Sequence, residues 1–174
     1  RFMRDPQEIK LTEKHAAGKI RQRFYEVEEQ DRLHTVGLLL NHFRPASTLA
    51  FCNTKQQCRD LVAVLQAQGL AALELHGDLD QRERDQVLVQ FANRSCSVLV
   101  ATDVAARGID VPTISHVINF GLPMKAEDYV HRIGRTGRAG RSGIAVTLAE
   151  RQDLSMIKRI QQFTTQSIPV SRIE

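Results

Sequence analysis

Short apolar runs alternate with amphipathic stretches along the chain from residue 20 onward. The first run, Ile20–Val27, predicts a strand, and Asp31–Phe43 predicts a helix because its apolar residues recur at three- and four-residue spacings. The residues of this helix that we expect to face the core are Leu33, Val36, Leu40 and Phe43. Further strands are predicted at Leu49–Cys52, Ala71–Leu75, Val98–Ala101, His116–Asn119 and Ile144–Leu148, and further helices at Lys55–Gln68, Gln81–Ala92, Ala126–Ile133 and Gln152–Phe163. This alternation predicts an α/β fold, with one mostly parallel sheet covered by helices on both faces.

The chain has the length of one domain. Its 174 residues, 42% of them hydrophobic, suffice for one core and are too few for two ordinary domains. Residues 1–19 show no sustained periodicity, so we interpret them as a linker or N-terminal arm and residues 20–174 as the domain. After the last helix, Ser167-Ile-Pro169 predicts an extended end.

Charge and cysteine content narrow the class of protein. There are 24 Lys and Arg against 20 Asp and Glu, and this mild excess favours a polyanionic partner. Cys52, Cys58 and Cys96 match no zinc-binding spacing and lie in or beside apolar segments, which is typical of reduced core cysteines in a cytoplasmic protein. No apolar run approaches the roughly 20 residues that span a bilayer, and the first residues lack the features of a signal peptide. We therefore expect a cytoplasmic protein without membrane association.

The segment from His131 to Arg141 carries the strongest chemical signal. Arg recurs at every third position, at 132, 135, 138 and 141, and no acidic residue interrupts the run. A guanidinium binds phosphate oxygens in a bidentate manner, and the intervening glycines allow a ligand to approach the backbone closely. The run therefore predicts phosphate binding. The alternative is a Gly-rich loop after a helix whose arginines are simply solvated.

Polar residues follow the predicted strands, and α/β sheets bind ligands at the carboxyl ends of their strands. These residues are Asn53, Thr54, His76, Gly77, Asp78, Thr102, Asp103, Asn119 and Gly121. Helix capping accounts for part of the set, and we assign most of Asp78, Asp80 and Asp103 to it. Capping does not explain Arg107-Gly-Ile-Asp110, which places a cation and an anion around a glycine. The alternative there is a surface ion pair.

The sequence lacks the motifs that hold a nucleotide. No G-x-x-x-x-G-K-[ST] loop is present, because Gly18-Lys19 is followed by Ile20 and Glu13 stands where the leading glycine belongs. No acidic cluster follows an apolar strand to hold Mg²⁺, and the six histidines show no metal-binding spacing, so we expect no metal site. The chain thus offers arginines for phosphates without the means to hold a nucleotide unaided.

Four segments resemble motifs of the DEAD-box RNA helicases. His131-Arg-Ile-Gly-Arg-Thr-Gly-Arg138 resembles motif VI, and Thr102-Asp-Val-Ala-Ala-Arg-Gly-Ile-Asp110 resembles motif V. Leu49-Ala-Phe-Cys-Asn-Thr-Lys55 is similar to motif IV, and His76-Gly-Asp with Gln81-Arg-Glu-Arg84 is similar to the Q-x-x-R element of the family. The four segments occur in the order and at the spacing of that family. The chain is thus identified as a C-terminal RecA-like domain of this family, and its compact core without long insertions is typical of a bacterial member.

The resemblance implies roles for individual residues. Arg138 matches the arginine finger on the γ-phosphate, Arg135 its neighbour on the same phosphate, and Asp110 a contact with the ribose. His131 is implied to link the nucleotide site to the RNA side. The residues implied to bind the RNA backbone are Thr54, Gly77, Gln81, Arg84, Thr102, Arg107 and Gly108, with Arg107 bridging toward Asp110 or a neighbouring acid.

The resemblance also implies what the complete protein does, which is ATP-driven local unwinding of RNA duplexes. ATP and RNA would bind across the cleft between this domain and an N-terminal RecA-like domain that carries the P-loop and DEAD motifs and holds Mg²⁺. The chain alone is then expected to be inactive. We expect RNA recognition through the backbone, since phosphate contacts carry no sequence information and the nine Phe and Tyr residues show no spacing for base stacking. Phe51, Phe91 and Phe120 are expected in the core.

Other functions stay open at this point. A superfamily 2 DNA translocase would share the fold. The RNA enzyme is favoured by His131, where many DNA helicases have Gln, and by the sequence Ala106-Arg-Gly-Ile-Asp110. A non-catalytic nucleic-acid-binding module would bind phosphates with an affinity that falls with salt and does not depend on ATP. Self-association of the isolated domain through its exposed cleft surface is also compatible with the sequence.

Overall fold

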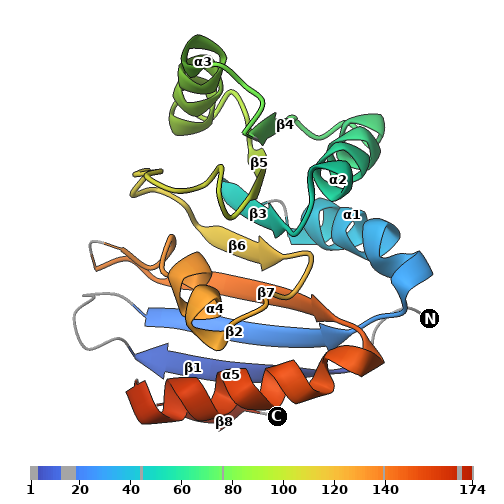
Figure 1. Cartoon of the computed structure of the whole chain (residues 1–174), viewed down its shortest axis with the longest axis vertical. Helices are drawn as coiled ribbons and strands as arrows, with labels where there is room; N and C mark the ends of the chain where they lie inside the picture. The colour runs from blue at the N-terminus through green and yellow to red at the C-terminus, as the bar shows by residue number, and fades with distance from the viewer. Residues whose placement is uncertain are drawn as a thin grey trace.

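One sheet organises the domain in the computed structural model (Figure 1). The structure describes residues 4–12, 19–43, 45–75, 77–138, 140–167 and 170–173, with side chains between residues 20 and 163. Its strands are β1 (Arg4–Thr12), β2 (Lys19–Glu26), β3 (Thr48–Cys52), β4 (Ala72–Leu75), β5 (Val98–Thr102), β6 (His116–Asn119), β7 (Gly143–Ala149) and β8 (Val170–Ile173). They lie in the order β4-β5-β3-β6-β7-β2-β1-β8. The strands from β4 to β2 are parallel, whereas β1 is antiparallel to both β2 and β8.

Helices cover both faces of this sheet. They are α1 (Arg32–Phe43), α2 (Lys55–Ala67), α3 (Gln81–Ala92), α4 (Ala126–Ile133) and α5 (Leu154–Ser167), with 3-10 turns at Glu29–Asp31 and Arg151–Asp153. Alternate residues of β3 separate the two faces, because Ala50 and Cys52 join one apolar cluster and Leu49 and Phe51 join another. The first cluster includes residues of α1 and α2, and the second face carries α3, α4 and α5. The predicted RecA-like fold, a mostly parallel sheet with helices on both faces, is confirmed.

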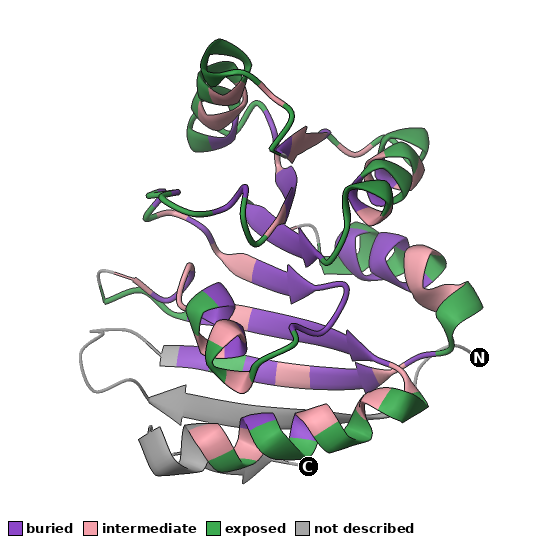
Figure 2. Ribbon diagram, in the orientation of Figure 1, coloured by how far each residue is buried: buried purple, intermediate pink, exposed green. Residues whose placement is uncertain are grey.

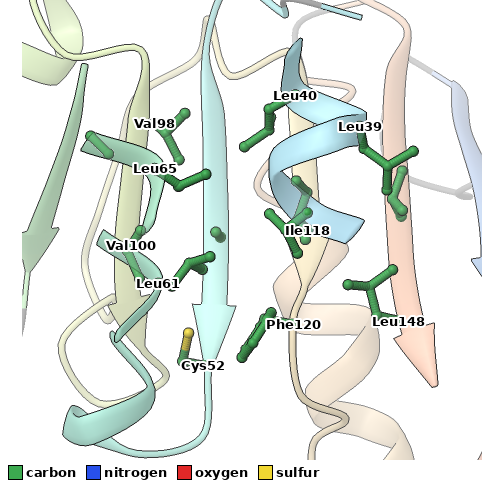
Figure 3. Close-up of a cluster of buried hydrophobic side chains, with 14 of the residues drawn as sticks. Leu39, Leu40, Cys52, Leu61, Leu65, Val98, Val100, Ile118, Phe120 and Leu148 are labelled. Atoms are coloured by element: carbon green, nitrogen blue, oxygen red, sulfur yellow. The ribbon is translucent and has the colours of Figure 1, made fainter. Parts of the chain in front are cut away.

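The central strands are buried, and the outward helix surfaces are exposed (Figure 2). Beneath α1 and α2, leucines from both helices pack against the sheet, as Figure 3 shows for Leu39, Leu40, Leu61 and Leu65. Phe51, Phe91 and Phe120 are buried as predicted. The apolar surface removed from water in this way is the main stabilising contribution to the fold.

The three cysteines are free and buried, as predicted. A hydrogen bond with Cys58 and burial raise the pKa of the Cys52 thiol, and burial raises the pKa of the Cys96 thiol. Thiols held in the neutral form are poor nucleophiles, so these groups act as core side chains.

Residues 103–115 cross the second face of the sheet where a helix would otherwise lie. Residues 103–108 form turns, and the segment then returns along the sheet to the start of β6. Its side chains Ala105, Ile109 and Ile114 are buried in the cluster that also contains Phe91 of α3. The apolar residues of a short segment interrupted by glycine therefore replace a helix as cover for the sheet, next to α4.

Three local predictions differ from the structure. Residues 4–12 were assigned no regular element, yet their backbone forms β1, which continues the sheet through its pairing with β2. Phe43 is 50% exposed because it is the last residue of α1, and Leu39 takes a core position instead. Ser167 belongs to α5 rather than to an extended end, whereas 168 and 169 lie outside the described residues.

Candidate functional site

The arginine-rich segment follows a short amphipathic helix. In α4, Glu127 and Asp128 occupy the first turn and His131 and Arg132 the last, which matches the direction of the helix dipole. The helix ends at Gly134, whose N–H donates to the carbonyl of Val130 at 3.0 Å. We call residues 134–138 and 140–142 the arginine loop. Its chain reversal uses left-handed glycines, because φ is +68° at residue 137 and +80° at residue 140.

The arginine loop lies against the segment between β5 and β6. Arg135 donates to the carbonyl of Ile109 at 3.0 Å, and Arg138 forms an ion pair with Asp110 at 3.7 Å. The side chains of Arg138 and Asp110 are 42% and 80% exposed, so both can reach a ligand. The three residues for which the resemblance implies ATP contacts therefore lie together. In Figure 1 this place lies beside the starts of β6 and β7, away from the carboxyl ends of the strands.

A second group of predicted residues lies at the carboxyl ends of β3, β4 and β5, which are neighbours in the sheet. The hydroxyl of Thr54 accepts from the N–H of Gln57 at 3.1 Å and caps α2. The hydroxyl of Thr102 accepts from the N–H of Ala105 at 3.3 Å. Gly77 is exposed just after β4, whereas the neighbouring His76 lies outside the described residues. The structure thus gathers Thr54, Gly77 and Thr102 at one edge of the sheet.

Gln81 and Arg84, from the first turn of α3, adjoin this edge. Gln81 donates to Asp85 at 2.8 Å. Arg84 donates to the carbonyls of Ala105 at 2.7 Å and Arg107 at 3.0 Å. These two hydrogen bonds hold the turns after β5 against the start of α3.

Arg107 and Gly108 are exposed at the end of those turns, and the φ of +79° at Gly108 requires the conformational freedom of glycine. Among the described residues, Asp110 forms its ion pair with Arg138 and not with Arg107. The implied bridge from Arg107 toward Asp110 or a neighbouring acid stays a prediction.

Arg132 is a functional candidate that the sequence analysis missed. It is 2% exposed, and its guanidinium makes a bidentate contact with Asp103, at 2.8 Å from Nε and 2.7 Å from Nη2. It also donates to Asn53 Oδ1 at 3.0 Å and to the carbonyl of Gly121 at 2.6 Å, and it lies 5.1 Å from the centre of the Phe51 ring. One side chain thus connects α4 with the ends of β3, β5 and β6.

The surroundings of Arg132 explain how a charge is tolerated there. A buried cation is stable only when its donors are satisfied and an opposite charge is close. Asp103 supplies the opposite charge, and its own side chain is 45% exposed to water. The sequence does carry a signal for the burial of Arg132. It lies three residues after Tyr129 and one before Ile133, and this spacing places it on the apolar face of α4. The interpretation of the run as simply solvated arginines does not hold for this position.

Two of the three acids assigned to helix capping have other roles. Asp80 does cap α3, with a capping box formed with Glu83. Asp103 instead pairs with Arg132, and Asp78 forms an ion pair with Lys55 at 2.8 Å. The capping assignment is therefore correct for Asp80 and wrong for the other two.

A pocket of about 430 Å³ separates the turns after β5 from α4. Charged residues of both signs line it, and His131 adds an exposed imidazole. These charged residues are Asp103, Arg107, Glu127, Asp128, Arg132 and Arg135. His131 and Arg135 thereby face the same space as the turns that follow Thr102.

Two possible features are not found in the described part of the chain. No group of three His, Cys, Asp or Glu side chains there could hold a metal ion. None of the helices described there has the length and apolarity to cross a bilayer.

The mostly parallel sheet with helices on both faces is the fold of a RecA-like domain. Residues 31–140 match the helicase conserved C-terminal domain family, and the chain belongs to that family. Its relatives place it among the C-terminal domains of the DEAD-box RNA helicases, as the sequence predicted.

Particular relatives include the ATP-dependent RNA helicase DbpA of Escherichia coli strain K12, which is 48% identical over 147 residues, 84% of this chain and 32% of the relative. The solved C-terminal domain of the DEAD-box protein Dbp5 matches with a TM-score of 0.75 and 34% identity, covering 80% of this chain and 81% of that one. Saccharomyces cerevisiae Dbp5 bound to RNA and ADP BeF3 matches with a TM-score of 0.75 and 34% identity, covering 81% of this chain and 38% of that one. The chain spans about a third of the length of the curated relatives it matches.

Proposed function

We propose that this chain is the C-terminal half of an ATP-dependent RNA helicase core and supplies the arginine finger for ATP hydrolysis. The observation that carries the proposal is the joint position of Arg135, Arg138 and Asp110, two cations and one carboxylate on facing loops. The chain lacks a phosphate-binding loop of its own. Such a site becomes complete only when a second domain presents the nucleotide.

The chemistry of this site is the stabilisation of negative charge. In phosphoryl transfer the transferred group carries charge on its oxygens, and an arginine finger accelerates the reaction by about 10³–10⁵-fold. Arg138 acts as this finger, Arg135 contacts the same phosphate, and Asp110 contacts the ribose. His131 links this site to the RNA side. The upstream RecA-like domain holds Mg²⁺ and the rest of the triphosphate.

RNA binds along the edge formed by the ends of β3, β4 and β5. Thr54, Gly77 and Thr102 offer small side chains and backbone groups there, with Gln81, Arg84, Arg107 and Gly108 close by. Contacts of this kind position a phosphate backbone without reading bases, so binding is independent of sequence. Closure of the two domains on ATP aligns this edge with the upstream domain and strains a short duplex, which leads to local unwinding.

The names of two relatives support this proposal. One is an ATP-dependent RNA helicase, and the other is solved with RNA and ADP BeF3. The chain spans about a third of its curated relatives. We therefore assign the activity to the complete protein and propose that the isolated chain is inactive. Its cytoplasmic location remains a prediction.

Substitution of Arg138 tests the proposal directly. In the two-domain enzyme, Arg138→Ala is expected to lower RNA-stimulated ATP turnover by about 10³-fold or more, since the charge of the transition state loses its partner. The measurement is steady-state phosphate release at saturating RNA.

Arg141→Ala is the matched control, because Arg141 is an exposed arginine of the same loop. It is expected to keep turnover close to that of the parent. Near-normal turnover of the Arg138→Ala enzyme, with a folded domain, would contradict the proposed role.

A further inference from the structure

Thr136 anchors the arginine loop from within. It lies between Arg135 and Arg138 and is only 1% exposed. Its hydroxyl donates to the carbonyl of Ile114 at 2.6 Å, within the segment that also contacts the two arginines. The two arginines are partly exposed and can leave their present partners for a ligand, whereas Thr136 stays buried. The position of the loop therefore depends on the surroundings of Thr136.

Gly143, the first residue of β7, packs directly against Thr136 and Gly137. A Cβ atom at residue 143 would lie 2.6 Å from the backbone nitrogen of Gly137 and 2.6 Å from Cγ2 of Thr136, and nearer still to the Thr136 hydroxyl oxygen. Real Cβ atoms do not approach other atoms so closely, so one of the two segments would have to shift. A side-chain rotation cannot relieve the clash, because one of the atoms is backbone and Thr136 is enclosed.

We propose that the close packing of Thr136 against Gly143, which we call the seat, determines the positions of Arg135 and Arg138. Gly143 is then a positioning residue for phosphate binding. This inference rests on the proposed function of the two arginines. Ordinary contacts of a Cβ atom begin near 3.4 Å, so a methyl group at residue 143 displaces the arginine loop by about 1 Å. Misplacement of a reacting geometry by about 1 Å can lower a rate by about 10²-fold.

Gly143→Ala in the two-domain enzyme tests the seat. We expect kcat for ATP to fall by about 10²-fold with a smaller change in KM, because the displaced arginines act mainly on the transition state. Thermal unfolding should stay cooperative. RNA binding measured without nucleotide should change much less than kcat, since Thr54, Gly77 and Thr102 follow the carboxyl ends of the strands, whereas residue 143 begins β7.

Gly37→Ala is the matched control. A Cβ atom at residue 37 would also be crowded, at 2.5 Å from Nε2 of Gln68, but the obstacle is the end of a flexible side chain. Gly37 lies in α1 on the opposite face of the sheet. Turnover of the Gly37→Ala enzyme should match that of the parent.

Substitutions of Thr136 separate its hydroxyl from its shape. Thr136→Val keeps the branched shape but leaves the carbonyl of Ile114 without its donor, and it is expected to lower kcat as Gly143→Ala does. Thr136→Ser keeps the hydroxyl and should retain clearly more activity than Thr136→Val. Equal losses for both variants would contradict the role of the hydrogen bond.

A double-mutant cycle with Arg138→Ala decides whether Gly143 acts through the arginines. The expected result is that Gly143→Ala lowers kcat much less in the Arg138→Ala background than in the parent. A full additional loss there, or parent-like turnover of Gly143→Ala itself, would overturn the inference. Normal turnover of Arg138→Ala would instead overturn the proposed function, so the two failures are distinguishable.

Discussion

At the scale of single residues, the pair of Arg132 and Asp103 should contribute strongly to stability. Asp103→Ala leaves the buried guanidinium without its carboxylate, and breaking a buried pair in this way costs about 3–5 kcal/mol. Because the Asp103 side chain is 45% exposed and water can partly replace it, we expect a loss near 2–3 kcal/mol. Urea unfolding of the isolated chain measures it.

Asp110→Ala provides the comparison, since it removes the same carboxylate from an ion pair that is open to solvent. Its side chain is 80% exposed, and such pairs contribute about 0–1 kcal/mol. Equal losses for Asp103→Ala and Asp110→Ala would contradict the description of Arg132 as a buried cross-link.

His116 should make the domain sensitive to mild acid. Burial and the nearby Arg23 charge lower the pKa of this imidazole below its usual value of about 6.5. The unfolded chain then binds the proton more readily, so the free energy of unfolding falls as the pH drops below about 6.5. His116→Gln should lose less stability than the parent between pH 7.5 and 5.5. Equal losses in the two proteins would show that His116 does not carry this dependence.

Sequence patterns identified single residues unevenly. The arginines of the loop and Asp110 were found because motif spacing fixes them, and the structure brings them together. Arg132 was missed because an arginine within a basic run indicates solvent or phosphate, whereas its actual environment comes from three strands distant in sequence. Asp103 was misassigned for the same reason, since its partner lies 29 residues away.

At the scale of elements, the end of α3 contains a residue in an unfavourable conformation. Arg94 adopts a φ of 68°, a left-handed conformation that disfavours residues with a Cβ atom. Arg94→Gly should raise the free energy of unfolding by about 0.5–1 kcal/mol, because it removes this strain at a modest entropic cost. Chemical denaturation of both proteins measures the difference.

Asn93→Gly tests the specificity of that effect. Asn93 has an ordinary φ of −90°, and its side-chain oxygen accepts from the N–H of Ser95 at 2.9 Å. Glycine there should destabilise the domain. A gain at residue 93 or a loss at residue 94 would contradict the conformational explanation.

Element boundaries were predictable where periodicity and end signals agree. α3, α4 and β6 begin and end at the predicted residues, since a capping box starts α3 and Gly134 ends α4. The orientation of α1 was less predictable, because Arg32 at its start is fixed by Glu150 at 3.1 Å and by the carbonyl of Phe120. β1 has no local signal, since it forms through pairing with β2.

At the scale of the whole molecule, the parallel sheet followed from the alternation of strands and helices. The position of the site did not. The carboxyl-end rule located the group around Thr54 and Thr102, but the arginines lie beside the starts of β6 and β7. They do so because the arginine loop connects the end of α4 to the start of β7, and a helix-to-strand connection lies at the amino ends of parallel strands.

The central claim is that this domain completes a nucleotide site that it cannot form alone. Steady-state ATP hydrolysis, with and without RNA, should be measured for the chain alone and for the chain joined to an upstream DEAD-box domain. We predict no turnover from the chain alone and RNA-stimulated turnover from the joined protein. Turnover by the isolated chain would contradict the claim, since it would require a complete nucleotide site within this domain.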